Sequence, residues 1–470
     1  MADTLYDVAI IGSGPAGYTA AIRAGQLGLS TALIEKDPYL GGTCLHVGCI
    51  PTKSLLFNAE VYDHVKDGDA LGIENLTPKL NWGTIMKRKQ GIVDKHAKGL
   101  QFLMKKNKVT VIEGYGKLTG PAKGGVHTVE VEGKNGKSTV SAKNLILSTG
   151  SVARMLPGTK ADDRILTNIE VLGLDSIPKS LIVIGSGAVG VEFASIYKSF
   201  GADVTILEML PRYVPVEDEE ISKELARVYR KRGINGFVNA KVETVERTKG
   251  GVAVTFTVDG KQQKIEADKV LIAVGRAPRT ENVGIEKTKV EVERGFVKVD
   301  EYMRTAEPGI YAIGDIAMGY PQLAHSGAME GIVAVTHIAG KPVKPINKLR
   351  IPNATYCHPE IGSVGLTEAK AKELGYDVKV GKFPFTANSR ASIVGSHDGF
   401  VKIVTDKKYG EILGVHIIGP NATELIAESV VALELECTAE HLAKIIHAHP
   451  TLAEAMLDAA NAVFGMPINA

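Results

Sequence analysis

One pattern occurs twice in this chain and constrains its fold more than any other: a buried strand, a glycine-rich turn, a helix and a second strand that ends in glutamate. The first copy opens with the strand Tyr6 to Ile11, and the second with Leu181 to Ile184. The glycines and acids are Gly12, Gly14, Gly17 and Glu35 in the first copy, and Gly185, Gly187, Gly190 and Glu208 in the second. In a dinucleotide-binding βαβ unit of this kind, the pyrophosphate lies on the helix N-terminus and the acid accepts from ribose hydroxyls. Two intact copies predict an α/β chain with two Rossmann-like domains that bind two dinucleotides. The less favoured alternative is that only one copy binds a dinucleotide.

The acid of the second copy also discriminates between nicotinamide cofactors. A carboxylate at Glu208 pairs with the free 2′-hydroxyl of NAD, whereas it repels the 2′-phosphate of NADP, which favours arginine. The next basic residue is Arg212, which follows a proline. The second copy therefore predicts NAD.

The segments around the two copies predict a β-rich insert and a separate C-terminal domain. Further strands are expected at 108–112, 127–131, 138–140, 145–150, 270–275 and 310–315. After about Pro345 the pattern changes to a meander of strands and then to helices at 422–436 and 439–446. We expect a nucleotide-binding domain over 1–150 that is completed by about 276–345, a second over 151–275, and an α+β domain over 346–470.

Two cysteines, Cys44 and Cys49, are separated by four residues. An ideal helix would place their Cα atoms roughly 8.7 Å apart, whereas a disulfide needs them within about 7 Å. If they are bonded, the backbone between them is therefore not a regular helix; Gly48 can relieve the strain, and Pro51 can open a helix after it. Local sequence leaves a redox pair and two separate buried thiols equally open. A zinc site is disfavoured because it needs four ligands at suitable spacing.

For several polar residues, the local sequence predicts a structural role. His449 precedes a proline and is expected on a loop, while Thr451 to Glu454 fits a capping box, with Glu454 reaching back to the Thr451 amide. Asp315 is expected to cap the helix that follows it, in preference to binding a ligand hydroxyl. From local sequence, Glu192 is expected to be only a charged residue in the first turn of a helix. The acidic run 217–220 is also expected in a first helical turn, without a function.

Charge and hydropathy exclude some classes of function. The net charge is +2 and no long basic run occurs, so nothing indicates nucleic acid. No charge-free apolar stretch reaches 18 residues, so no membrane span is expected. Four cysteines are too few for a secreted disulfide scaffold. No signal or transit segment is recognisable at the start, and we expect a cytoplasmic protein.

Taken in order, the motifs resemble those of the pyridine nucleotide-disulfide oxidoreductases. They are Gly-Gly-Thr-Cys-x4-Cys-Ile-Pro-Thr-Lys at 41–53, the two glycine fingerprints, Ala-Ile-Gly-Asp at 312–315 and His-Pro-Thr-x-x-Glu at 449–454. The resemblance covers essentially the whole chain and is strongest to the members that oxidise dihydrolipoyl groups. The cysteine and histidine motifs together are highly specific, whereas the glycine motifs are not.

The resemblance implies a role for each matching residue. It implies FAD at Gly12, Gly14, Gly17, Glu35, Gly150 and Asp315, which replaces the capping role of Asp315, and NAD at Gly185, Gly187, Gly190, Glu208 and Gly275. Lys53 and Glu192 match an ion pair beside the flavin. Cys44 matches the thiol that exchanges with substrate, and Cys49 the thiol nearest the flavin. His449 matches the catalytic base and Glu454 the carboxylate that orients it.

The implied reaction is the oxidation of a dihydrolipoyl group with reduction of NAD⁺. The expected partner is the lipoyl domain of a 2-oxoacid dehydrogenase complex or the H protein of glycine cleavage, and the expected assembly is a homodimer whose histidine motif serves the partner subunit. His449 would deprotonate a substrate thiol, and the thiolate would attack Cys44. Cys49 would then pass the electrons to FAD, and the reduced flavin would reduce NAD⁺.

Other disulfide reductases of the family are the alternatives. A glutathione reductase would use NADPH, against which Glu208 argues, and a mercuric reductase usually ends in a cysteine pair that this C-terminus lacks. A flavin transhydrogenase would not need the cysteines, and a non-enzymatic subunit would need none of the redox residues. One departure from the family is His46, which stands where asparagine is more usual.

Overall fold

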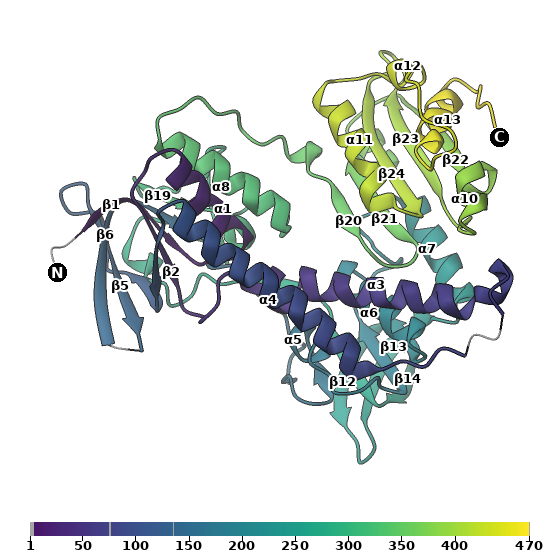
Figure 1. Cartoon of the computed structure of the whole chain (residues 1–470), viewed down its shortest axis with the longest axis horizontal. Coiled ribbons are helices and arrows are strands. Elements are labelled where there is room, and N and C mark those ends of the chain that lie inside the picture. The colour runs from purple at the N-terminus through teal and green to yellow at the C-terminus, as the bar shows by residue number, and fades with distance from the viewer. Residues whose placement is uncertain (1–3, 75–76, 135, 470) are drawn as a thin grey trace. The chain divides into compact units, whose positions relative to one another are not determined.

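The computed structural model describes residues 4–74, 77–134 and 136–469. The chain forms two compact units. The first comprises Met1–Ser54, Gly83–Arg154 and Arg276–Ile346, and the second comprises Leu55–Trp82, Met155–Gly275 and Asn347–Ala470 (Figure 1). The expected α/β class, with two nucleotide-binding folds and a C-terminal α+β domain, is confirmed.

The first unit is built on a mixed sheet of seven strands. Its order is β3-β2-β1-β6-β5-β4, with β19 beside β6. The strands are β1 (Leu5–Ile11), β2 (Thr31–Glu35), β3 (Thr110–Glu113), β4 (Tyr115–Leu118), β5 (His127–Gly133), β6 (Gly136–Leu147) and β19 (Ile310–Ala312). The strands β3, β2, β1, β6 and β19 run parallel, and β4 and β5 continue the sheet antiparallel to their neighbours.

The prediction of two strands at 138–140 and 145–150 is wrong, because the structure has the single strand β6. Its polar middle stays in the ladder: Ser141 pairs with Leu5 of β1 on one side and with Thr128 of β5 on the other. Backbone hydrogen bonds on both sides hold this segment extended whatever its side chains. Beyond it, Leu145 to Leu147 runs parallel between β1 and β19.

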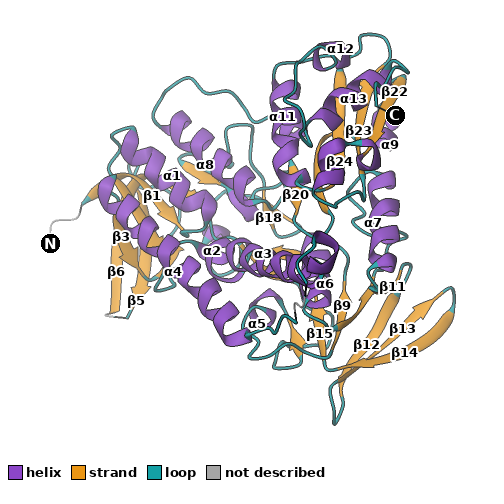
Figure 2. Cartoon of the chain, turned by 45° about the vertical axis from the view of Figure 1, so that its right-hand side comes forward, coloured by secondary structure: helices purple, strands orange, loops and turns teal. Residues whose placement is uncertain are grey.

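Two helices of the first unit, α1 (Pro15–Gln26) and α8 (Ala324–Ile338), lie side by side (Figures 1 and 2). Small residues allow this approach: a Cβ at Gly331 would lie 2.8 Å from the Ala16 carbonyl oxygen. The alanine face of α1 packs with Val8 and Ile10 of β1 in one core. The close packing fixes the start of α1, where the first glycine fingerprint lies.

The second unit contains the second βαβ unit and the C-terminal domain. The parallel sheet has the order β11-β10-β9-β15-β8, with β8 (Ile165–Leu166), β9 (Ser180–Ile184), β10 (Asp203–Leu207), β11 (Asn235–Phe237) and β15 (Lys269–Ile272). The helix α6 (Ala188–Ser199) follows β9, and the helix α7 (Glu219–Lys231) follows β10. A separate antiparallel sheet comprises the long, curved strands β12 (Lys241–Arg247), β13 (Val252–Val258) and β14 (Lys261–Ala267) (Figure 2).

The C-terminal domain is an antiparallel sheet of order β20-β21-β24-β23-β22 with helices packed on it. Its elements are β20 (Asn353–Thr355), β21 (Glu360–Gly365), β22 (Val378–Pro384), β23 (Phe400–Asp406), β24 (Ile412–Gly419), α11 (Ala422–Glu434), α12 (Ala439–Leu442) and α13 (Glu454–Val463). The helix expected at 439–446 is too long, since it ends at Leu442. Leu442 is its last buried residue, and Ile446, the last residue of the expected helix, is 96% exposed.

The remaining elements are short segments and two long helices. They are α2 (Gly42–Val47), α3 (Cys49–Lys66), α4 (Trp82–Lys106), α5 (Asn168–Val171), α9 (Glu368–Glu373), α10 (Ser389–Ile393), β7 (Ser151–Ala153), β16 (Arg276–Pro278), β17 (Val292–Glu293) and β18 (Phe296–Val297). Among the described residues, no helix has the length and apolar character that crossing a membrane requires.

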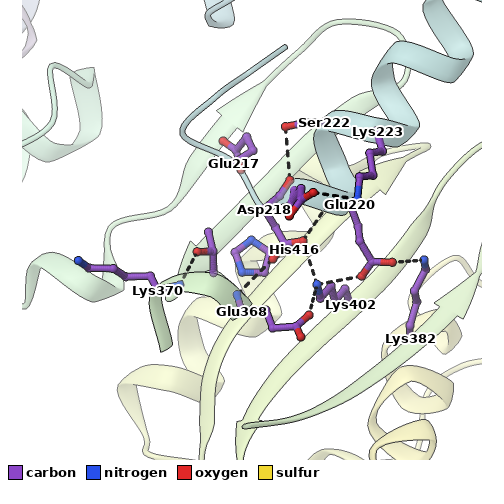
Figure 3. Close-up of polar contacts among 12 residues, drawn as sticks. Glu217, Asp218, Glu220, Ser222, Lys223, Glu368, Lys370, Lys382, Lys402 and His416 are labelled. Carbon is purple, nitrogen blue, oxygen red and sulfur yellow. Dashed lines mark hydrogen bonds and ion pairs between the residues drawn. The ribbon is translucent and has the colours of Figure 1, made fainter. Parts of the chain in front are cut away.

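The acidic run 217–220 does more than begin a helix. Glu219 and Glu220 lie in the first turn of α7, as expected, but Asp218 is its N-cap and Glu217 is buried ahead of it. Asp218 and Glu220 surround the buried ammonium of Lys402 on β23, together with Glu368 of α9 (Figure 3). The run therefore links the second nucleotide-binding fold to the C-terminal sheet.

Candidate active site

Cys44 and Cys49 form a disulfide whose Cα atoms are 4.6 Å apart. Cys44 lies in α2 and Cys49 is the first residue of α3, so the expected break in the helix is confirmed. Gly48 makes the break: a Cβ there would lie 2.8 Å from the Thr43 carbonyl oxygen. Pro51 stands in the first turn of α3, where its missing N–H costs nothing. Both cysteines are partly exposed, which suits a bond that exchanges with a substrate.

The side chain of His46 contacts the loop that precedes α2. Its Nε2 lies 2.8 Å from the Leu40 carbonyl oxygen, to which it donates, and its ring lies beside that of Tyr39. A carbonyl oxygen only accepts, so Nε2 carries the proton in this arrangement. His46 thus anchors α2 to the preceding loop.

The first glycine fingerprint presents an uncapped helix end. Gly12 has a φ of +102°, which favours glycine. Gly14 is the N-cap of α1 without a side-chain hydrogen bond, and a Cβ at Gly14 would meet nothing within 4 Å. The N-terminus of α1 thus has no side-chain cap and has open space beside Gly14, which fits a pyrophosphate.

Glu35 is held in place at the end of β2. Its Oε2 accepts from the Ser13 amide at 2.8 Å and from the Ser13 hydroxyl at 2.7 Å, and Oε1 accepts from the Asp37 amide at 2.9 Å. A carboxylate offers about four acceptor sites, so acceptor capacity is left for a ribose hydroxyl.

The second fingerprint repeats this geometry. Gly185 has a φ of +98°, and Gly187 is an uncapped N-cap that faces open space. Oε2 of Glu208 accepts from the amide and the hydroxyl of Ser186, both at 2.7 Å, and Oε1 accepts from the Leu210 amide at 2.8 Å. Both copies fit a dinucleotide by the same construction.

Asp315 is not a helix cap, so that prediction from local sequence is wrong. It lies in a short 3-10 turn, and α8 begins later, at Ala324, without a side-chain cap. The Ser151 hydroxyl donates to Oδ2 of Asp315, and Nε of Arg276 lies 3.7 Å from the same oxygen. The tertiary partners that hold Asp315 come from β7 and β16, which local sequence could not associate with it.

His449 and Glu454 form a hydrogen-bonded pair in the second unit. Nδ1 of His449 lies 2.8 Å from Oε1 of Glu454, and Oε2 accepts from the Thr451 amide at 2.8 Å. Glu454 therefore reaches back to that amide as expected and also binds the histidine. The capping box is only half formed, because the Thr451 hydroxyl donates to the Ala448 carbonyl and α13 begins at Glu454.

The pair leaves one histidine nitrogen available for chemistry. Burial raises the pKa of Glu454, but the hydrogen bonds from the Thr451 amide and His449 outweigh it and lower this pKa below its ordinary 4.5. Glu454 is then ionised near neutral pH and accepts from Nδ1–H, which leaves Nε2 of the neutral ring with a lone pair. The His449 side chain is 71% exposed. Nε2 can thus take a proton from a substrate.

Two further candidates lie on helices. Lys53 is on α3 in the first unit, and Glu192 is on α6 in the second, where it is buried and its Oε1 accepts from the Tyr356 amide at 2.9 Å. Glu192 is thus more than a surface charge in a first helical turn. The pairing of Lys53 with Glu192 stays a prediction.

Three serines take part in the site although sequence reasoning did not single them out. Ser13 and Ser186 orient the two fingerprint acids, and Ser151 binds Asp315. The sequence could have identified the first two serines, since Gly-Ser-Gly opens both copies. It could not have identified Ser151, because the residue that Ser151 binds is distant in the sequence.

Comparison with known families agrees with this geometry. Residues 6–331 match the pyridine nucleotide-disulphide oxidoreductases, and residues 351–460 match the dimerisation domain of the same family. The chain belongs to the pyridine nucleotide-disulphide oxidoreductase family. It is thus an oxidoreductase of a family that uses FAD and NAD(H), and it carries the family's dimerisation domain.

Relatives of full length share one activity in their names. The chain is 47% identical to a dihydrolipoyl dehydrogenase of Rhizobium etli and 44% identical to one of Bacillus subtilis, each over 99% of both chains. Among solved structures it is similar to LpdA of Mycobacterium tuberculosis, with a TM-score of 0.89 and 30% identity over 97% of this chain and 98% of that one. It is also similar to the flavoprotein disulfide reductase RclA of Escherichia coli, with a TM-score of 0.86 and 26% identity over 97% and 99% of the two chains.

Proposed function

We propose that the protein is a dihydrolipoyl dehydrogenase: it oxidises a dihydrolipoyl group to the cyclic disulfide and reduces NAD⁺ to NADH. The observation that carries this proposal is the bonded pair Cys44–Cys49 in a chain whose full-length relatives have that name. The exposed His449, oriented by Glu454, supplies the base that thiol oxidation needs.

The thiol steps balance with the residues of this chain. Nε2 of His449 takes the proton of one substrate thiol, and the thiolate attacks the Cys44 sulfur, which breaks the Cys44–Cys49 bond and leaves a Cys49 thiolate. The second substrate thiol, once deprotonated, displaces Cys44 and closes the lipoyl disulfide. The substrate has then lost two electrons, and the cysteine pair has gained them as a dithiol. When bound, FAD supplies the two-electron transfer from this dithiol to NAD⁺.

The cofactor sites follow from the two fingerprints. FAD is assigned to Gly12, Gly14, Gly17, Glu35, Gly150 and Asp315, with the Lys53–Glu192 pair beside the flavin, and NAD to Gly185, Gly187, Gly190, Glu208 and Gly275. Open space at Gly14 and Gly187 and the held carboxylates of Glu35 and Glu208 support both assignments. The corresponding domains are 1–150 with 276–345 for FAD, 151–275 for NAD, and 346–470 for the interface.

The physiological partner proposed is a lipoyl domain of a 2-oxoacid dehydrogenase complex or the H protein of glycine cleavage. The protein works as a homodimer, and His449 and Glu454 of one subunit serve the disulfide of the other. The dimerisation domain, which contains both residues, supports this arrangement. We also propose that the protein is cytoplasmic, because the cytoplasm is a reducing environment in which a dithiol substrate stays reduced.

Subunit mixing tests the proposal. Cys44→Ser and His449→Ala should each be inactive in dihydrolipoamide oxidation with NAD⁺. Random reassociation of the two variants should restore up to roughly a quarter of wild-type activity per subunit, because about half the dimers are mixed and each has one intact site. If subunit exchange is verified and no activity returns, a site shared between subunits is ruled out. Reduced glutathione as the thiol substrate should give no comparable turnover.

A further inference from the structure

Two histidines of the same loop have opposite surroundings. His447 and His449 lie between the end of α12 and the start of α13. The side chain of His447 is 6% exposed, whereas that of His449 is 71% exposed. The reaction proposed above uses only His449. His447 is thus a buried titratable group beside the base, without a role in the thiol steps.

Both ring nitrogens of His447 have a hydrogen-bond partner. Its Nδ1 lies 3.1 Å from the Ile445 carbonyl oxygen, and its Nε2 lies 2.9 Å from Oε1 of Glu428. The carbonyl only accepts, so Nδ1 must donate. Both ring nitrogens of His447 are thus held, one by the Ile445 carbonyl oxygen and the other by the carboxylate of Glu428.

The hydrogen-bond partner of His447, Glu428, lies on a helix that is packed in the core. It lies in the middle of α11, whose buried residues Ile426, Ala432 and Leu433 pack in the core of the C-terminal domain. Residues 443–453, all of which the structure describes, form no helix or strand. Backbone hydrogen bonds tie Ala443, Lys444 and Ile445 to α12. The next contact along the loop is the bond from Glu428 to His447, which lies two residues before the base.

His447 also acts electrostatically on the base pair. The pKa of Glu454 is raised by burial and lowered by the Thr451 amide and His449, and His447 adds to this lowering.

We propose that His447 is a positioning residue: its hydrogen bonds to Glu428 and to the Ile445 carbonyl hold the loop so that His449 meets Glu454 and presents Nε2 to a thiol. This inference rests on the proposed role of His449 as the base. The orientation of the base acts on proton transfer in the transition state, so it affects kcat for dihydrolipoamide oxidation and not the binding of the substrate.

Variants of Glu428 separate the hydrogen bond from the charge. In Glu428→Gln, the amide N–H can donate to Nε2 of a neutral ring whose Nδ1–H stays on the Ile445 carbonyl, so the loop stays attached. In Glu428→Ala and His447→Ala the attachment is lost. Lys444→Ala is the matched control, because it removes an exposed ion pair with Glu440 in the neighbouring turn.

The experiment measures two activities of the flavin-loaded dimer: dihydrolipoamide oxidation with NAD⁺, and NADH oxidation by ferricyanide, which bypasses the thiols. We expect His447→Ala and Glu428→Ala to lower kcat for dihydrolipoamide about 10-fold or more, since a 1 Å misplacement costs up to about 10²-fold. KM and the ferricyanide activity should stay unchanged. Glu428→Gln should keep kcat within about 3-fold, Lys444→Ala should equal wild type, and the double alanine variant should be no slower than His447→Ala.

Failure of the inference and failure of the proposed base are distinguishable. Wild-type kcat in both alanine variants, with a loss in His449→Ala, overturns the inference alone. Equal losses in Glu428→Gln and Glu428→Ala also overturn it, because the amide retains the hydrogen bond. Full activity in His449→Ala overturns the proposed base and, with it, the positioning role of His447.

Discussion

Nζ of Lys402 lies 2.9 Å from Oδ1 of Asp218, and both side chains are 2% exposed. Glu220 and Glu368 complete the shell around Nζ at 2.8 Å and 2.7 Å. Burial alone would lower the pKa of Lys402, but hydrogen bonds from the ammonium to the three carboxylates outweigh it and raise this pKa above its ordinary value. The ammonium of β23 thus stays charged inside the protein, where it holds the N-terminus of α7.

Removing this cation should strongly destabilise the second unit. Lys402→Met leaves Asp218 buried without its partner, and breaking a buried pair from one side costs about 3–5 kcal/mol. Denaturant unfolding at fixed protein concentration, followed by circular dichroism, measures the loss. Lys223→Met is the matched control, because the ion pair of Lys223 with Glu219 is exposed, and it should leave the unfolding midpoint unchanged. A midpoint equal to wild type in Lys402→Met would contradict the structural role of the network.

Glu217, beside the same network, should make stability depend on pH. Burial raises the pKa of Glu217 to about 7; the Ser363 hydroxyl opposes this and the charge of Asp218 adds to it. Oε2 of Glu217 has no hydrogen-bond partner among the described residues. His416 and Lys402 also belong to this cluster (Figure 3). Since the folded state binds the proton more tightly than the unfolded chain, the stabilisation is present at low pH and is lost as pH rises from about 4.5 to about 7.

Glu217→Gln keeps a neutral side chain of the same size at every pH. Relative to wild type, its stability should improve by about 2.5 kcal/mol between pH 5 and pH 8, since one pKa unit corresponds to about 1.4 kcal/mol. Melting temperatures of both proteins over this range provide the measurement. Curves that stay parallel would show that Glu217 does not titrate in the folded protein.

Alanine substitutions at two glycines of the second fingerprint should have different effects, one on folding and the other on cofactor binding. A Cβ at Gly190 would lie 1.9 Å from the Gly185 carbonyl oxygen, whereas one at Gly187 meets nothing within 4 Å. Gly190→Ala should therefore lower thermal stability, because backbone has to move. Gly187→Ala should melt like wild type but raise KM for NAD⁺ about 10-fold, since the methyl group occupies the approach of the pyrophosphate. Normal NAD⁺ kinetics in Gly187→Ala would place the cofactor elsewhere.

Cofactor preference should depend on one carboxylate. Glu208→Gln removes the negative charge that repels a 2′-phosphate, so the ratio of kcat/KM for NAD⁺ to that for NADP⁺ should narrow at least about tenfold, or ~1.4 kcal/mol. Glu35→Gln, the matching change in the first fingerprint, should leave the ratio unchanged among molecules that retain FAD. Equal ratios in Glu208→Gln and wild type would remove Glu208 as the discriminating group.

Local patterns predicted most elements of the fold, because strands and helices with one buried face have clear periods. Failures occurred where distant partners decide the outcome. β6 is continuous because β1 and β5 pair with its polar middle, and neither pairing is visible in 138–147 alone. The expected cap at Asp315 failed for the same reason, since Ser151 and Arg276 hold that carboxylate.

The site was predictable to a different degree for each residue. The fingerprint acids Glu35 and Glu208 follow from spacing alone, and their geometry is the same in both copies. Glu454 was assigned two competing roles, and the structure shows that one carboxylate fills both, with one oxygen on His449 and the other on the Thr451 amide. The hydrogen bond of Glu428 with His447 could not be predicted from the sequence, because it depends on how α11 and the loop pack together.

The order of strands in the first sheet has a consequence for synthesis on the ribosome. β19 joins the sheet beside β6, yet the whole stretch Met155–Gly275 lies between them in the chain. During translation, the parallel end of β6 is therefore an unpaired edge until Ile310–Ala312 has emerged, while the second nucleotide-binding fold is already complete. Unpaired edges invite pairing with other chains. A nascent chain paused before β19 should bind chaperones more than one released after it.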